Sequence, residues 1–350
     1  MALTPNSTIS CPLVFACDAG YAMPLATTLR SIAEANRSAW PLEVYILSDG
    51  FSENTKRKVI DSLPKGSSSF RWLPADLAAF AGFSTLQHIS TATYARLLIS
   101  SKLPDRVHRA LYLDADILVL DDLAPIWELD LEGAVLGAVL DDRLSTHIKM
   151  GNSSPAGLPR VRDYFNAGVL LIDLVLWRAE QISEKALEYL ERYPHSPYSD
   201  QDALNVACDG LWKKLDSRWN YYQIDLEKPL SDLSDAQRPG IVHFQGWSKP
   251  WDPSSLNLNA RFYDSFRTRT LFACTPEERL RHVPLVIWSR LKRVLKRSVI
   301  VSHVWNQLRS LQSRDGSNTA RRLSASRFKS VTQSIDSTRC HEDDAIRGNP

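Results

Sequence analysis

Short apolar runs alternate with stretches of helical spacing along the first two thirds of the chain. Most of these apolar runs end in Asp, Ser or Gly, which is typical of buried strands that lead into polar turns. The alternation predicts an α/β fold with a mostly parallel central sheet and helices on both faces. The predicted strands lie at 12–20, 42–50, 69–75, 111–120, 133–142, the start of 164–178 and the start of 241–253. The predicted helices lie at 22–36, 52–63, 91–103, the end of 164–178 and 199–210.

The predicted strand at 111–120, LYLDADILVL, carries two aspartates inside an apolar run. A buried carboxylate is costly unless it is paired, hydrogen-bonded or bound to a metal. Asp114 and Asp116 are two positions apart, which places both on one face of an extended chain. Carboxylate oxygens are common ligands of Mg²⁺ and Mn²⁺. The stretch therefore indicates a divalent-cation site, and two solvated acids at a strand end are the simpler alternative.

Aspartates follow several other predicted strands as well. In open parallel sheets, ligands bind beyond the carboxyl ends of the strands. Neither GxGxxG nor GxxxxGK[ST] follows the first strand, so the dinucleotide fingerprint and the P-loop are both excluded. The sequence predicts an acidic rim where a metal and a nucleotide meet. The aspartates at or near these strand ends are Asp18, Asp49, Asp114, Asp116 and Asp141.

The composition is that of a globular protein with one large domain. Of the 350 residues, 44% are hydrophobic and 23% are charged, and no apolar run is long enough to span a membrane. No signal peptide is predicted, because the N-terminus lacks a charged region followed by an apolar one. The five cysteines are scattered and form no CxxC pair, which favours free thiols in a reducing compartment. A cytoplasmic protein is expected.

Charge is unevenly distributed along the chain. Residues 281–330 hold 12 Lys or Arg and one Asp, a net charge of +11, whereas the rest of the chain carries −9. Within this basic segment, 284–305 has helical spacing with two contrasting faces. The largely apolar face comprises Pro284, Ile287, Trp288, Leu291, Val294, Leu295, Ser298 and Trp305. The basic face comprises Arg290, Lys292, Arg293, Lys296 and Arg297.

Such a helix is typical of a segment that lies on an anionic membrane surface. The alternative is a helix docked on its own domain with a solvated basic face. Nucleic acid is disfavoured as a partner, since no recognition motif accompanies the charge. The chain is thus divided into a globular domain at 1–275, a basic amphipathic helical segment at 276–311 and a tail at 312–350. The tail is poor in large apolar residues, which predicts disorder.

Six short motifs rich in polar and aromatic residues occur in order between residues 12 and 253. Together they resemble glycosyltransferase family 8, which includes bacterial lipopolysaccharide galactosyl- and glucosyltransferases and glycogenin. The motifs are FACDAGY (15–21), TYARL (93–97), YLDADILV (112–119), YFNAGVLLID (164–173), SDQDALN (199–205) and HFQGWSKPW (243–251).

The resemblance implies a GT-A type nucleotide-diphospho-sugar transferase fold, with 1–275 as the glycosyltransferase catalytic domain. It implies a retaining enzyme that moves a hexose from UDP-galactose or UDP-glucose to a saccharide acceptor. Lipopolysaccharide or another lipid-linked glycan is the expected acceptor. Related bacterial transferases attach to the inner face of the membrane through a basic, aromatic tail, so a cytoplasmic, peripherally membrane-bound protein is expected.

The resemblance also assigns a metal site. In the family, the two DxD aspartates and a late histidine hold Mn²⁺ on the diphosphate of the UDP-sugar; here these are Asp114, Asp116 and His243. An imidazole beside two carboxylates favours Mn²⁺ over Mg²⁺, which remains the alternative metal. Gly246 and Lys249 match the positions that contact the phosphates, where a Lys neutralises leaving-group charge.

The first motif matches the uridine site of the family, where Asp18 accepts from the uracil N–H and Tyr21 stacks on the ring. Ala16 completes this turn. Many members carry Asp and Asn where this chain has Ala19 and Gly20. Ala19 and Gly20 do not offer the side-chain contacts to the ribose that Asp and Asn would make. The prediction of a nucleotide cleft at the strand end is unaffected.

Other matched positions contact the donor sugar in the family. Asp200 is equally explained as an acid at a helix N-terminus, which the helix dipole favours. Gln201 matches the position near the anomeric carbon, and an amide is a poor nucleophile for the double displacement by which many enzymes retain configuration. The resemblance thus favours a front-face reaction, with Gln201 and Asp200 as the catalytic candidates. The matched donor-site residues are Arg96, Ala115, Asn166, Ala167, Asp200 and Gln201.

The acceptor site is expected in the later loops, with His88, Asp141 and Trp247 as candidates. One alternative function is a haloacid dehalogenase-like phosphatase with Asp114 as nucleophile. That family places its DxD near the start of the domain and needs a later Lys and a second acidic pair, which this sequence does not offer in that order. The other alternative is a non-catalytic, membrane-associated sugar-nucleotide-binding protein, which the retained Asp114, Asp116 and His243 disfavour.

Overall fold

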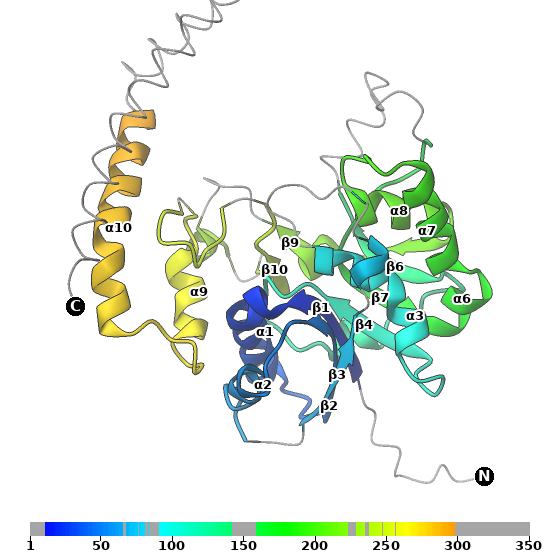
Figure 1. The fold of residues 1–350 in the computed structure, drawn as a ribbon, viewed down its shortest axis with the longest axis horizontal. Coiled ribbons are helices and arrows are strands. Elements are labelled where there is room, and N and C mark those ends of the chain that lie inside the picture. The colour runs from blue at the N-terminus through cyan, green and yellow to red at the C-terminus, as the bar shows by residue number, and fades with distance from the viewer. Residues whose placement is uncertain are drawn as a thin grey trace, which may run out of the picture. The chain divides into compact units, whose positions relative to one another are not determined.

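The computed structural model describes most of the chain up to Arg297 (Figure 1). It divides into two compact units after Val286, and the fold that follows belongs to the first of them, except that the helix Pro276–Arg297 continues past Val286. The residues described are 11–65, 68–75, 77–80, 83, 91–141, 159–222, 229–234, 238–246, 248–255 and 257–297.

A seven-stranded sheet in the order β3-β2-β1-β4-β7-β6-β8 forms the centre of the fold. All neighbouring strands are parallel except β7, which runs antiparallel to both β4 and β6. The predicted mostly parallel sheet is thus confirmed, and the reversal of one strand is an addition to it. The strands are β1 (Cys11–Asp18), β2 (Leu42–Asp49), β3 (Ser68–Pro74), β4 (Arg109–Leu113), β6 (Leu136–Leu140), β7 (Phe165–Asp173) and β8 (Trp212–Lys214).

Helices cover both faces of this sheet. Alternate residues of β1 enter two separate cores, with Leu13 and Phe15 in one and Val14 and Ala16 in the other. Apolar residues of α1 fill the first core, and those of α7 and α8 fill the second. The α-helices are α1 (Ala22–Ala35), α2 (Glu53–Ile60), α3 (Ile99–Lys102), α4 (Ala124–Trp127), α6 (Leu174–Ala179), α7 (Ile182–Arg192), α8 (Ser199–Ala207), α9 (Ala260–Arg267) and α10 (Pro276–Arg297). The predicted helix at 91–103 is a 3₁₀ helix over Thr91–Leu98 followed by α3. The other 3₁₀ helices are η1 (Ala19–Tyr21), η2 (Leu77–Phe80), η4 (Ser217–Asn220) and η5 (Leu230–Asp232).

The apolar run at 111–120 is two strands in two different sheets, so the prediction of a single strand there was wrong. After β4 the chain leaves the central sheet and forms β5 (Ile117–Val119), which pairs with β10 (Ile241–His243); β10 in turn pairs with β9 (Tyr221–Tyr222). The Thr28 side chain holds the crossing by donating to the Ala115 and Ile117 carbonyls at 2.9 and 2.7 Å. Because both strands are buried, their apolarity alone did not reveal the break.

One edge of the central sheet gathers the polar residues of the strands. Since β1, β2, β4 and β6 are parallel to one another, their carboxyl ends meet at this edge. The reversed strand β7 begins there, so its first residues join the same edge. This is the acidic rim that the sequence predicts.

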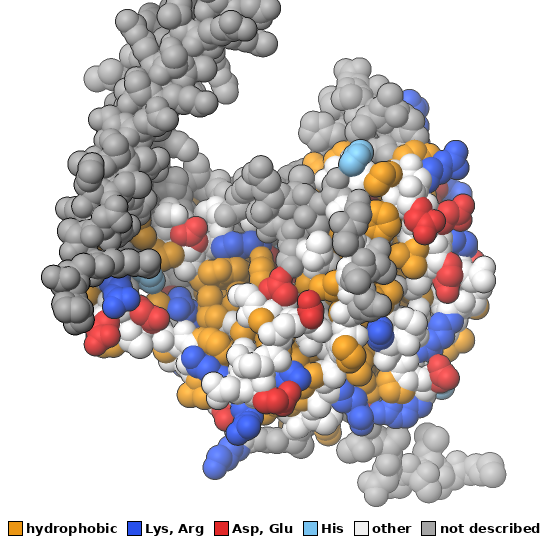
Figure 2. All heavy atoms as spheres, viewed as in Figure 1, with side chains coloured by type: hydrophobic (Ala, Val, Ile, Leu, Met, Phe, Trp, Pro, Cys, Tyr) orange, Lys and Arg blue, Asp and Glu red, His pale blue; other side chains and the backbone are white. Residues whose placement is uncertain are grey.

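Three further observations concern the surface charges, the length of the helices and the cysteines. On the face shown in Figure 2, acidic and basic side chains are interspersed over the described residues. None of the helices that the structure describes is long and apolar enough to cross a bilayer. The described cysteines, Cys11, Cys17, Cys208 and Cys274, are free thiols, as predicted.

Candidate metal and nucleotide site

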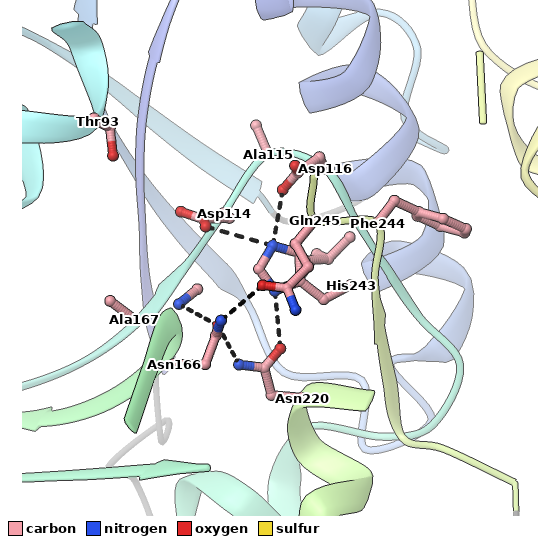
Figure 3. A network of polar contacts seen from close by, with 12 residues as sticks. Thr93, Asp114, Ala115, Asp116, Asn166, Ala167, Asn220, His243, Phe244 and Gln245 are labelled. Atoms are coloured by element: carbon pink, nitrogen blue, oxygen red, sulfur yellow. Dashed lines mark hydrogen bonds and ion pairs between the residues drawn. The ribbon is translucent and has the colours of Figure 1, made fainter. Parts of the chain in front are cut away.

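Asp114, Asp116 and His243 come together between the two sheets. Both aspartates lie in the crossing from β4 to β5, and His243 ends β10, which pairs with β5. The His243 Nε2 atom lies 3.3 Å from Asp116 Oδ1 and 3.6 Å from Asp114 Oδ2 (Figure 3). One ligand atom of each residue lies within 4.8 Å of the others. The predicted trio is therefore assembled, and its two carboxylates and imidazole suit a divalent cation.

Asp116 is buried and yet is not fully satisfied. Its Oδ2 atom pairs with Lys249 Nζ at 2.5 Å, whereas its Oδ1 atom makes no hydrogen bond within the part of the chain that the structure describes. Burial by itself raises the pKa of Asp116, but the charges of Lys249 and His243 outweigh it and hold the pKa below the ordinary value. An ionised carboxylate with one buried oxygen that accepts no hydrogen bond and faces His243 fits a metal ligand.

Gly168 leaves room for the His243 ring. Its own position on β7 brings the backbone so close that a Cβ atom there would lie 2.2 Å from His243 Cε1 and 2.9 Å from Asp114 Oδ2. The Gly168 carbonyl also accepts from Asp114 N at 2.8 Å. A side chain at this position is therefore incompatible with the trio as it stands.

Asn220 and Asn166 connect His243 to β7. Asn220 Oδ1 lies 3.0 Å from His243 Nδ1, and Asn220 Nδ2 donates to Asn166 Oδ1 at 2.8 Å. Asn166 Oδ1 also accepts from Gly168 N, while Asn166 Nδ2 donates to Gln245 Oε1 at 2.9 Å. The predicted donor-site residue Asn166 thus lies beside the metal ligands, whereas Asn220 and Gln245 escaped the sequence analysis.

Arg96 balances the carboxylates on the other side of the site. Its guanidinium pairs with Asp200 Oδ2 at 2.8 Å and Asp114 Oδ1 at 3.0 Å, and it donates to the Ala167 carbonyl at 2.7 Å. Tyr112 adds a hydroxyl that donates to Asp114 Oδ1 at 2.7 Å. Burial raises the pKa of Asp200, against the lowering effect of Arg96. Arg96 and Asp200, both predicted from the motifs, therefore lie within one charge network with Asp114.

Gln201 is held at both ends of its amide. Its Oε1 atom accepts from Ala167 N at 3.0 Å, and its Nε2 atom donates to Tyr164 Oη at 3.2 Å. The Tyr164 hydroxyl in turn donates to Asp202 Oδ1 at 2.6 Å. Ser199, at the start of α8, has a left-handed φ of 50°, a conformation that ordinary residues seldom adopt. The hydrogen bonds at both ends of the Gln201 amide therefore fix the orientation of this side chain.

The first turn carries the residues for which the motifs predict contacts to a nucleotide. Asp18 ends β1 and accepts from Gly20 N at 2.8 Å, and Ala16 lies two residues earlier on the same strand. The Tyr21 ring packs edge-on against Trp251, with centroids 6.0 Å apart. Burial, together with the nearby carboxylates, raises the pKa of the Tyr21 hydroxyl. These contacts place the predicted uridine turn next to the loop that carries Lys249 and Gly246, whose φ of 87° requires a glycine.

Of the three candidate acceptor-site residues, the structure describes one. Asp141 follows β6, is buried, and accepts from Tyr222 Oη at 3.3 Å. His88 and Trp247 lie outside the described residues.

The residues that sequence reasoning missed lie beside predicted ones. Asn220 in the stretch RWNYY and Gln245 in HFQGW are polar residues that adjoin β9 and β10, and Gly168 stands inside the quoted YFNAGVLLID. A polar residue beside a buried strand is a usable signal. Only the pairing of β10 with β5 tells which of these residues face the aspartates.

A mostly parallel sheet with this acidic trio and Lys249 at its carboxyl edge is characteristic of a GT-A type glycosyltransferase. The profile of the family described as Glycosyl transferase family 8 matches residues 12–254. The chain belongs to glycosyltransferase family 8.

Individual relatives agree with this assignment. General stress protein A of Bacillus subtilis (strain 168) is 28% identical over 256 residues, which are 69% of this chain and 88% of that protein. The lipopolysaccharide 1,2-glucosyltransferase of Escherichia coli (strain K12) is 26% identical over 260 residues, 72% of this chain and 75% of its own. The solved structure of galactosyltransferase LgtC, in complex with donor and acceptor sugar analogues, superposes with a TM-score of 0.64 at 30% identity and covers 78% of this chain and all of that one.

Proposed function

We propose that this glycosyltransferase moves galactose or glucose from a UDP-sugar to a lipopolysaccharide-type or other cell-surface saccharide, with retention of configuration and with Mn²⁺ as cofactor. The observation that carries the proposal is the buried trio of Asp114, Asp116 and His243, with Lys249 beside it at the carboxyl edge of the sheet. The hexose and the acceptor class are supported by the names of the relatives, a lipopolysaccharide 1,2-glucosyltransferase and a galactosyltransferase.

Each residue of the site has a task in this proposal. Asp114, Asp116 and His243 would hold a divalent cation, which would supply Lewis-acid charge for the diphosphate leaving group. Lys249, which pairs with Asp116, would neutralise the charge of the same phosphates. Arg96 pairs with Asp114 and Asp200 and holds both carboxylates in place. In the turn after β1, Asp18 accepts a hydrogen bond from the uracil N–H and Tyr21 stacks on the uracil ring.

Retention is proposed to proceed at the front face of the sugar. Both carboxylates near Gln201 are already engaged, since Asp200 pairs with Arg96 and accepts from Thr93 Oγ1 at 3.1 Å. Asp202 accepts from the Tyr164 hydroxyl, from Ser196 Oγ and from Tyr198 N. Attack on the anomeric carbon by Asp202 would break hydrogen bonds on both of its oxygens, and attack by Asp200 would loosen its pair with Arg96, so these contacts favour the front-face reaction over a double displacement.

The phosphatase alternative is disfavoured by the surroundings of Asp114. A phosphatase nucleophile must present an unhindered carboxylate oxygen to phosphorus. Asp114 Oδ1 already accepts from Arg96 and Tyr112, and Asp114 Oδ2 faces His243. Asp114 is better suited to bind a metal than to attack phosphorus.

The proposal is tested by release of UDP from a panel of UDP-sugars with Mn²⁺ and then with EDTA. We expect slow hydrolysis of UDP-galactose or UDP-glucose that stops when EDTA removes the metal, because the leaving diphosphate then lacks its counter-charge. The control is the same panel with Mn²⁺ restored. No release and no UDP binding in Mn²⁺ would overturn the proposal. A hexose found covalently attached to Asp200 or Asp202 by mass spectrometry would overturn only the front-face reaction.

Peripheral membrane attachment through the C-terminal segment is part of the proposal. The segment forms α10 as far as Arg297, and apolar side chains of this helix are exposed to solvent. These are Leu280, Val283, Leu285, Ile287 and Leu291. Leu280, Val283, Ile287 and Leu291 recur at helical spacing and form an exposed apolar stripe, which on a basic helix is the pattern of a helix that binds anionic lipid. Residues 298–350, including the rest of the predicted helix and the tail, lie outside the described residues.

We expect the full chain to sediment with phosphatidylethanolamine vesicles that contain phosphatidylglycerol, and the chain ending at residue 280 to remain in the supernatant. The cause is loss of the basic and apolar residues that contact the lipid. Vesicles of neutral lipid alone serve as the control, and high salt should weaken the attachment. Equal sedimentation of both chains would remove the C-terminal segment from this role.

A further inference from the structure

A chain of side-chain amides runs from a backbone N–H to the metal-ligand histidine. Its links are the Asn166 and Asn220 side chains, and Asn220 contacts His243. Asn166 also donates to Gln245, which forms a side branch (Figure 3). Asn166, Asn220 and His243 are shielded from bulk water, since they are 2%, 1% and 3% exposed, whereas Gln245 is partly exposed. Solvent therefore does not compete with the direction of these hydrogen bonds.

The backbone amide of Gly168 fixes the direction of the first amide. This N–H can only donate, and the Gly168 nitrogen lies 3.0 Å from one terminal atom of the Asn166 side-chain amide. The Asn166 atom that faces it must then be the carbonyl oxygen, because an NH₂ group there would oppose one donor with another. The Asn166 NH₂ group is thereby turned toward Gln245, whose carbonyl oxygen receives it at 2.9 Å.

The same direction passes on to Asn220 and His243. The Asn220 atom 2.8 Å from Asn166 Oδ1 must be its NH₂ group, since Asn166 Oδ1 is an acceptor. The other end of Asn220 is therefore its carbonyl oxygen, which lies 3.0 Å from His243 Nδ1. An imidazole nitrogen that faces a carbonyl oxygen must carry the proton.

We propose that Asn166 and Asn220 are positioning residues that hold the proton of His243 on Nδ1 and so present Nε2 to the metal. The inference rests on the proposed metal site and extends it to residues that do not contact the metal themselves. A histidine that binds a metal usually donates its other N–H to an oxygen acceptor, which orients the ring and sets its tautomer. Here the acceptor is an asparagine, and its own orientation is set by the backbone of β7.

The hydrogen-bonded series of Asn166, Asn220 and His243, called the relay from here on, also sets the orientation of Gln245. Its carbonyl oxygen is taken by Asn166, so its NH₂ group points away from the relay. The Nε2 atom is buried and finds no acceptor among the residues that the structure describes. An oxygen of the bound substrate is a suitable acceptor for it, because a buried donor without a partner is costly.

Two variants separate the links of this relay. Asn220→Leu removes the acceptor of His243, and we expect Mn²⁺ binding, measured by electron paramagnetic resonance, to weaken about 10- to 100-fold. Asn166→Asp keeps an oxygen toward Gly168 N and Asn220, and we expect it to bind Mn²⁺ within about threefold of the wild type or more tightly. Asn259→Leu is the matched control, because Asn259 is equally buried, accepts from Leu230 N and lies outside the relay.

The outcomes distinguish this inference from the proposed function. If the wild type binds no Mn²⁺, both fall together. If the wild type binds and Asn220→Leu binds within about threefold of it, only the relay is overturned. Loss of binding in Asn166→Asp equal to that in Asn220→Leu would also overturn it, because the acceptor for Asn220 is kept there.

A measurement on the unmodified chain covers the case in which Asn220→Leu does not fold. Nitrogen-15 spectra of histidine-labelled protein with Mg²⁺ report which ring nitrogen carries a proton, and His243 is assigned by its loss in His243→Gln. We expect a proton on Nδ1 that exchanges slowly with water, and none on Nε2. A proton on Nε2 of the Mg²⁺-bound protein would overturn the inference whatever the variants do.

Discussion

Replacing Asp116 by Asn will reduce the rate of UDP-sugar turnover by at least about 1,000-fold, which corresponds to about 4 kcal/mol of transition-state stabilisation. Asn has the volume of Asp but carries no charge. Its amide offers a single carbonyl oxygen, which can still accept from Lys249, but the NH₂ group then replaces the oxygen that lies 3.3 Å from His243 Nε2, and an NH₂ group cannot bind a cation. The metal would lose a charged ligand, and Lys249 would lose its counter-charge.

The measurement is UDP release by Asp116→Asn, together with its affinity for Mn²⁺. Asp61→Asn is the control, because Asp61 is exposed at the end of α2 and the same change there should leave both quantities unaltered. A folded Asp116→Asn protein that turned over within tenfold of the wild type would show that the metal does not use this carboxylate.

Gly168→Ala is expected to abolish metal binding through a single added methyl group. The new Cβ would lie 2.2 Å from His243 Cε1 and 2.7 Å from His243 Nδ1, far inside van der Waals contact. Neither partner can yield at low cost, because β7 is a central strand and His243 is held by Asn220. We expect His243 to be displaced, turnover to fall about 100-fold or more, and stability to fall by about 1–3 kcal/mol.

Gly137→Ala separates the loss of stability from the loss of the site. Its Cβ would lie 2.9 Å from Leu215 Cδ2 and 3.0 Å from Leu131 Cδ2, in the core and away from the metal ligands. We expect this variant to unfold at a lower temperature and still bind Mn²⁺ with wild-type affinity. Should Gly168→Ala retain both Mn²⁺ affinity and turnover, the His243 position described above could not be the functional one.

The acidic residues illustrate how far a motif can be carried into three dimensions. Asp114, Asp116 and His243 were all assigned from the sequence, and the structure brings them within ligand distance of one another. The physical argument for the pair was less accurate. The two aspartates do not share a face of one strand, because both lie in the crossing from β4 in one sheet to β5 in the other. Their proximity to His243 depends on the pairing of β5 with β10, more than a hundred residues later.

The alternation of strands and helices was sufficient to predict the architecture. The parallel order of β1, β2, β3 and β4 follows from it, since each connection carries the chain back across a face of the sheet. The antiparallel insertion of β7 does not follow, because an apolar run has the same composition in either direction. That reversal is what places the start of β7, and with it Asn166, at the edge where the carboxyl ends of its neighbours meet.

The residue types on which the chemistry depends, and the local elements that carry them, can be read directly along the chain. Periodicity and strand-end aspartates are local properties, so they are legible along the chain. The tertiary structure alone decided which hydrogen-bonding atoms face each other. The amide chain from Gly168 N through Asn166 and Asn220 to His243 joins three segments, and no local pattern encodes the direction of its hydrogen bonds. That direction follows from one backbone N–H that close packing places beside a buried amide.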